Sequence, residues 1–146
     1  MKMTRSLVAV SALALSAMFV ACGDDNSSTS PSSSESKCAV SNGVVVVSPA
    51  AGDSYKVGET ITVVFGSDID AGGFDVEYRV DENSKGKSVT GGESVGPETP
   101  DGKTCYEVKI TLDKDLVEPS KEAVIRVIPY ANQGKGANSA PFTVAE

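Results

Sequence analysis

The feature that most constrains the fold of this chain is a series of short segments in which apolar and polar residues alternate. The clearest reads FDVEYRV and covers residues 74–80. Its apolar side chains fall on one face and Asp75, Glu77 and Arg79 on the other, the pattern of a β-strand with one buried and one wet face. No window of about 11 residues shows the 3.6-residue apolar period of an amphipathic helix. The pattern therefore predicts an all-β structure.

Six more segments of this kind are separated by turn residues. They cover residues 43–49, 60–65, 86–92, 106–112, 123–129 and 141–144. In 123–129 we expect Ala123, Ile125 and Val127 to point inward, because the other register would bury Arg126. About seven short strands after Cys38 predict a single Ig-like antiparallel β-sandwich.

The wet face of residues 74–80 is expected to be solvated. If that strand pairs with 123–129, Arg126 lies near Glu77 and the two charges form a weak surface pair.

The first 21 residues have the pattern of an export signal. Lys2 and Arg5 give a positive amino-terminal region, and an apolar run from Leu7 to Ala21 follows. That run is shorter than the about 20 residues that a membrane-spanning helix needs. We therefore predict a signal peptide over residues 1–21.

The sequence FVAC at residues 19–22 resembles the lipobox of bacterial lipoproteins. The resemblance implies cleavage before Cys22, a diacylglyceryl group on its thiol, and a stable membrane anchor of several acyl chains such as palmitate. Because Gly23 rather than Asp follows, it also implies the outer membrane in preference to the inner one.

Residues 23–37 read GDDNSSTSPSSSESK and hold no large apolar side chain. Ordering such a segment would cost backbone entropy that no burial offsets. We predict a lipidated cysteine and flexible tether over residues 22–37, with a glycosylated stalk as the alternative. The β-sandwich domain is then expected over residues 38–146.

Two further cysteines, Cys38 and Cys105, belong to the expected domain. Thiols outside the cytoplasm tend to oxidise, and these two allow one pairing. A disulfide that closes a loop of roughly 67 residues stabilises the fold by about 4 kcal/mol in the chain-entropy description. A metal or redox pair is the alternative, but no third or fourth soft ligand accompanies them.

The charge balance disfavours some partners and activities. The formal net charge is −7, and losing Lys2 and Arg5 with the signal peptide makes it −7 − 2 = −9. A chain this acidic is unsuited to nucleic acid or an anionic bilayer surface. It also has no His, so a Ser-His-Asp triad is impossible and the commonest transition-metal ligand is missing. We expect a non-enzymatic protein that uses no cofactor, calcium being the exception considered next.

Asp68, Asp70 and Asp75 gather in the segment GSDIDAGGFD. Carboxylates at alternate positions begin calcium loops, but an EF-hand would need Asp or Asn at 72 and Glu at 79, where this chain has Gly72 and Arg79. We expect a polar turn, with a weak extracellular calcium site as the alternative.

Exposed aromatic rings are the feature to seek for sugar binding. The mature chain keeps four Tyr and three of the four Phe, and most point inward by phase. Tyr130 is the first ligand-binding candidate and Tyr55 the second. The predicted register also exposes Val124 and Ile128 on the face of Tyr130, as a small recognition patch. Ordinary scattered surface apolarity is the alternative.

A second resemblance concerns the start of the expected domain. Residues 44–65 read VVVVSPAAGDSYKVGETITVVF, in which the key positions are Ser48, Pro49, Gly52, Tyr55, Gly58 and Phe65. This resembles the opening of the Kre9/KNH-type, Ser-Thr-rich-anchored module, and SAPFTV at 139–144 is similar to its last strand. The resemblance implies an Ig-like sandwich of secreted or wall-associated proteins, often near polysaccharide, and it transfers no catalytic residue.

Two functions stay open from the sequence. The first is a lipid-anchored, non-enzymatic accessory module at the cell surface or in the periplasm that engages another envelope protein. The alternative is a module that binds cell-wall or plant polysaccharide. The expected partners are thus the membrane, through the lipid, and an envelope protein or polysaccharide, but no nucleic acid.

Overall fold

The computed structural model describes residues 35–90 and 105–146. Within these ranges the chain is all-β, with nine strands and two single-turn 3₁₀ helices, η1 (Glu35–Cys38) and η2 (Gln133–Lys135). No helix in the same ranges has the length and apolarity that crossing a membrane requires. The predicted signal peptide, Cys22 and residues 23–34 of the predicted tether lie outside the described residues.

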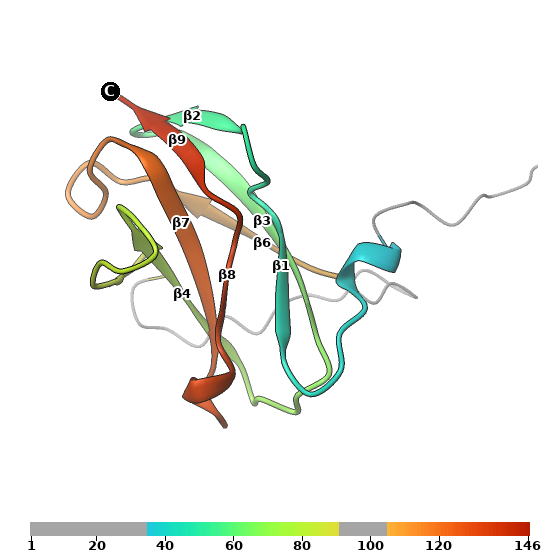
Figure 1. Cartoon of the computed structure of the whole chain (residues 1–146). Helices are drawn as coiled ribbons and strands as arrows, with labels where there is room; N and C mark the ends of the chain where they lie inside the picture. The colour runs from blue at the N-terminus through green and yellow to red at the C-terminus, as the bar shows by residue number, and fades with distance from the viewer. Residues whose placement is uncertain (1–34, 91–104) are drawn as a thin grey trace, which may run out of the picture.

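The strands form two sheets that face each other (Figure 1). The first sheet has the order β1-β3-β6, from β1 (Val44–Ser48), β3 (Thr60–Ser67) and β6 (Cys105–Thr111). The second has the order β2-β9-β7-β4-β5, from β2 (Ser54–Lys56), β9 (Phe142–Ala145), β7 (Ser120–Pro129), β4 (Phe74–Arg79) and β5 (Lys87–Ser88), with β8 (Ala137–Asn138) also paired to β7. The predicted Ig-like β-sandwich is confirmed. One pairing departs from the antiparallel expectation, because β2 runs parallel to β9.

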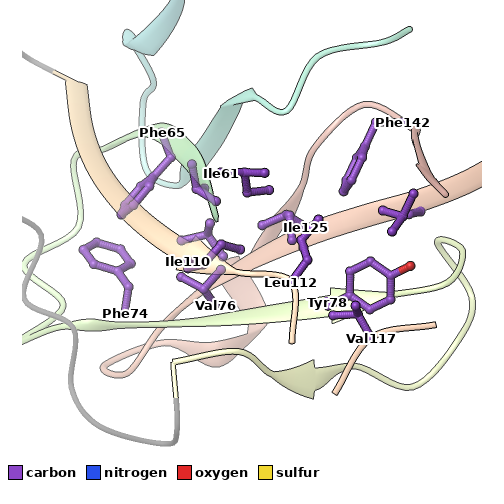
Figure 2. Close-up of a cluster of buried hydrophobic side chains, with 14 of the residues drawn as sticks. Ile61, Phe65, Phe74, Val76, Tyr78, Ile110, Leu112, Val117, Ile125 and Phe142 are labelled. Carbon is purple, nitrogen blue, oxygen red and sulfur yellow. The ribbon is translucent and has the colours of Figure 1, made fainter. Parts of the chain in front are cut away.

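The core lies between the sheets and is filled by the alternating apolar side chains (Figure 2). Phe65 and Phe74 meet edge to face across the sandwich, with ring centroids 5.0 Å apart. The inward register of β7 is as predicted, because Ala123, Ile125 and Val127 are all fully buried. Period-two alternation was sufficient to find these faces, since each strand has a core on one side only.

The structure adds two short strands to the expected set. Residues 54–56 were expected to be part of a turn, yet β2 pairs with β9, and the Tyr55 ring packs edge-on against Phe142 with centroids 5.7 Å apart. The other addition, β8, has only two residues. Strands this short have too few residues to show an alternating pattern, so tertiary pairing defines them.

The amino-terminal end of the domain is fixed by the predicted disulfide, which is confirmed. Cys38 at the end of η1 is bonded to Cys105 at the start of β6, with the two Cα atoms 5.3 Å apart. Cys38 also lies directly over Gly66 of β3, where an added Cβ would stand 1.8 Å from the Cys38 carbonyl oxygen. Because neighbouring Phe65 points into the core, Gly66 faces outward. Cys38 therefore covers the outer face of the three-stranded sheet.

Candidate functional site

An open pocket of about 320 Å³ lies on the outer face of the six-stranded sheet, over β4 and β7. This volume falls in the range typical of small-ligand sites, which is about 300–1,000 Å³. Its wall is mostly polar and is made by Asp75, Glu77, Arg79, Arg126, Ile128, Tyr130 and Gln133. The first three come from β4 and alternate with buried residues, so the strand's own period places them on this face.

The register of β4 and β7 sets charged residues opposite one another. Glu77 faces Arg126, and Asp75 faces Ile128. The predicted proximity of Arg126 to Glu77 is thus confirmed, but the ion pair is a different one. Arg79 Nη2 lies 2.9 Å from Glu77 Oε2, and Arg79 Nε donates to the same oxygen at 3.3 Å.

These two side chains are less solvated than expected. Glu77 and Arg79 each expose 20% of their side-chain surface, so they form a partly covered pair rather than a fully wet face. The expectation of a solvated strand face was therefore too simple. Partial burial strengthens the electrostatic interactions of groups in the pocket relative to the open surface.

Arg126 is oriented by a neutral partner. Its Nη1 donates to Asn138 Oδ1 of β8 at 2.9 Å. The ion pairs of the described residues are Arg79–Glu77 and Lys87–Glu118, so no carboxylate in that part of the chain pairs with Arg126. A guanidinium keeps its charge and has five N–H donors. Arg126 therefore brings donors to the pocket that are not matched by an internal carboxylate.

Asp75 is held by two hydroxyl groups. Its Oδ1 accepts from Ser88 Oγ at 2.7 Å and from Thr90 Oγ1 at 3.1 Å. Asp75 belongs to the predicted calcium cluster, but the structure puts it on the pocket wall. Among the described residues no three His, Cys, Asp or Glu side chains gather as a metal ion would require.

The other two acids of that cluster lie elsewhere. Asp68 accepts from the backbone N–H groups of Asn42 and Gly43, the latter at 2.8 Å, and these bonds lower the pKa of its carboxyl group. It thus ties the segment before β1 to the end of β3. Asp70 is exposed. The arrangement matches the polar-turn interpretation and gives the calcium hypothesis no support.

The predicted ligand residues separate into two groups. Tyr130 lines the pocket and is 37% exposed. Among the described residues, no other large hydrophobic side chain is exposed. Ile128 is half-buried in the pocket wall. The predicted exposure of Val124 is wrong, because Val124 is only 1% exposed. It lies opposite Arg79 in β7, a central strand with β4 on one side and β9 on the other, so neighbouring residues on both sides limit the exposure of a small valine.

Tyr55 does not contribute to the pocket. It is half-buried, and its hydroxyl donates to Asp53 Oδ2 at 3.2 Å. Burial, followed by the charge of Asp53, raises the pKa of its hydroxyl. Its role in the structure is to pack β2 against Phe142 of β9.

Sequence reasoning missed the pocket walls formed by Arg79 and Gln133. The only available signal was the polar side of residues 74–80 together with the expected β4–β7 pairing, and this was interpreted as a solvated surface.

A second hollow, lined by Tyr78, Leu116 and neighbouring lysines, has a volume of only about 100 Å³. It is too small for the usual ligand range.

Comparison of the chain with protein-family models and with curated proteins finds no match.

Proposed function

We propose that this chain is a non-enzymatic, lipid-anchored module of a bacterial cell envelope that binds saccharide in the pocket over β4 and β7. The observation that carries the proposal is the pocket's composition. It combines carboxylates, guanidinium groups and an amide with one exposed tyrosine ring. Sugars present hydroxyl groups that both donate and accept, beside apolar C–H faces. Planar polar side chains suit the hydroxyls, and an aromatic ring suits the C–H face.

The attachment point of the tether supports this proposal. Cys38 lies on the outer face of the three-stranded sheet, whereas the pocket lies on the outer face of the other sheet. Figure 1 shows η1 beside β1 and β3, with β4 and β7 across the sandwich. A chain segment leading back to a lipid on Cys22 thus enters opposite the pocket. As a random coil, the predicted tether would span about 20 Å, which lets the pocket face away from the bilayer.

The disulfide supports the proposed compartment, because such bonds persist outside the reducing cytoplasm. It is compatible with the periplasm as well as with the cell surface.

An envelope protein is the second candidate partner. The observation that favours it is a group of half-buried valines outside the core, Val45 and Val47 of β1 and Val64 of β3. Protein interfaces are anchored by larger apolar and aromatic side chains than these, so we rank this candidate below saccharide binding.

The test is co-sedimentation of the mature chain, residues 22–146, with insoluble glucans and with cell-wall material. We expect the chain to sediment with at least one polysaccharide and to be released by the matching soluble oligosaccharide. If it stays in the supernatant with all of them, the proposed function is wrong. Cross-linking of the anchored protein to a neighbouring envelope protein, from a photoreactive group introduced at one of these valine positions, would then favour the second candidate partner.

A further inference from the structure

We infer that the pocket selects neutral saccharides and holds two adjacent hydroxyl groups of the ligand between Glu77 and Arg126. This inference rests on the saccharide-binding function proposed above and specifies the ligand and the contacts. It follows from three features of the site: the register, the internal hydrogen bonds and the charge balance.

The register places the backbone positions of an acceptor and a donor opposite each other. Glu77 and Arg126 are directly opposite in the antiparallel β4–β7 pair. In such a pair the Cβ atoms are about 4.5–5.5 Å apart, and both side chains leave the same face of the sheet. Neighbouring hydroxyls on a sugar ring can therefore contact both, one donating to the carboxylate and the other accepting from the guanidinium.

Internal hydrogen bonds orient the Glu77 carboxylate and the Arg126 guanidinium, and they leave an acceptor oxygen and several N–H donors for a ligand. Arg79 occupies Oε2 of Glu77, and among the described residues no hydrogen bond reaches Oε1. Asn138 holds one nitrogen of Arg126, whose other donors have no carboxylate partner in the described part of the chain. Groups that are already oriented lose little side-chain entropy when a ligand binds.

The charge balance disfavours an acidic sugar. Asp75 and Glu77 offset Arg79 and Arg126, so the four charges of the wall sum to zero. A uronate would bring a third carboxylate next to two others, on a chain whose formal net charge is −7. Like charges at close range cost binding energy, whereas a neutral hexose meets no such repulsion.

The test is calorimetric titration of the mature chain with soluble hexasaccharides. The neutral probes are the β-1,4-glucose, β-1,3-glucose and β-1,4-xylose hexamers, and the acidic probe is the galacturonate hexamer. The pocket variants are Glu77→Gln, Arg126→Gln and the charge-preserving Arg126→Lys. Matched controls are Glu107→Gln and Lys109→Gln, which make the same charge changes on exposed positions of β6. Thermal unfolding confirms that each variant is folded.

We expect a neutral hexamer to bind, each pocket variant to bind it about tenfold more weakly, and both controls to bind it like the parent chain. Tighter binding of the galacturonate hexamer, lost in Arg126→Gln, would overturn the neutral selectivity and leave the proposed function standing. Neutral binding that is unchanged in all pocket variants would overturn the Glu77–Arg126 contact. If no hexamer binds and no polysaccharide sediments the chain, the proposed function and this inference both fail.

Discussion

At the scale of single residues, the proposed saccharide binding depends most on the ring of Tyr130. It lies beside the charged residues of the pocket. Among the described residues, it is the only large hydrophobic side chain that is exposed. Its backbone N–H donates to the Gly73 carbonyl oxygen at 3.1 Å, so the start of the loop after β7 is tied to the start of β4. This bond fixes the backbone that carries the ring beside the pocket.

Tyr130→Ala removes the apolar surface on which a sugar face would lie, and we expect about tenfold weaker binding to the neutral hexamer. Tyr130→Phe keeps the ring and should bind within a factor of about three of the parent chain. Calorimetric titration of both variants measures the effect. Equal affinity of Tyr130→Ala and the parent chain would exclude the ring from the site.

Tyr78 gives a prediction about stability at alkaline pH. It is buried in the core, and its hydroxyl donates to the Glu118 carbonyl oxygen in the loop before β7. Burial, together with the Glu118 charge, raises the pKa of Tyr78 from 10.0 to about 12. Because the folded state favours the protonated hydroxyl, this contribution is complete below pH 10.0 and is lost as the pH rises towards 12.

We therefore expect the free energy of unfolding to fall between those pH values, and to fall less steeply in Tyr78→Phe. At neutral pH the same variant loses one hydrogen bond, at a cost of about 1 kcal/mol. Urea unfolding across the pH range measures both effects. Tyr55 also has a raised pKa, so some alkaline loss should remain in the variant. Identical pH profiles would contradict the assignment to Tyr78.

Strand β7 shows what the sequence could and could not predict for single residues. Alternation identified the inward residues of β7 correctly, because a buried face leaves a regular signal. It failed for Val124, since exposure on the outer face of a central strand depends on which residues the neighbouring strands place beside it. Those neighbours come from distant parts of the chain, so no local pattern reports them.

At the scale of elements, the contact of η1 with β3 fixes the amino-terminal entry of the domain. The approach is so close that only glycine fits at position 66, since an added Cβ would collide with backbone atoms of Cys38. Gly66→Ala should therefore lower the free energy of unfolding by about 1–3 kcal/mol. The matched control is Gly43→Ala, whose Cβ would meet nothing closer than 3.8 Å. Equal urea midpoints for the two variants would show that η1 does not pack on β3.

The disulfide holds the same contact covalently. Its residues are 67 positions apart, so replacing both with Cys38→Ala and Cys105→Ala should cost about 4 kcal/mol through the unfolded chain. Urea unfolding of the double variant, compared with the reduced parent chain, measures this cost. The double variant and the reduced parent chain should have the same urea midpoint. If the double variant instead has the midpoint of the oxidised parent chain, the disulfide does not give the expected stabilisation.

The elements also explain why the pocket was not predicted as a site. Its walls come from β4 and from β7 with the loop beyond it, which are about 50 residues apart in the sequence and meet only through sheet pairing. The pairing of these strands and the Glu77–Arg126 proximity could be anticipated from period and charge. The pocket itself could not, because its depth depends on how side chains fill the space between strands.

At the scale of the whole molecule, the proposal requires a lipid at one end and a free pocket at the other. Intact mass spectrometry of the protein extracted from membranes should give a chain that begins at Cys22 and carries acyl groups. Formation of the disulfide should lower its mass by about 2 Da, because oxidation removes two hydrogen atoms, one from each thiol. An unmodified chain that keeps residues 1–21 would contradict the lipoprotein assignment.

The most direct test of the central claim is a nuclear magnetic resonance titration of the isotopically labelled mature chain with the neutral hexasaccharide that binds most tightly. We predict that the amide signals that shift belong to β4 and β7, with Glu77, Arg126 and Tyr130 among them. The signals of Val45 and Val64, on the outer face of the other sheet, should stay in place. Shifts confined to that opposite face, or no shifts at saturating ligand, would contradict saccharide binding over β4 and β7.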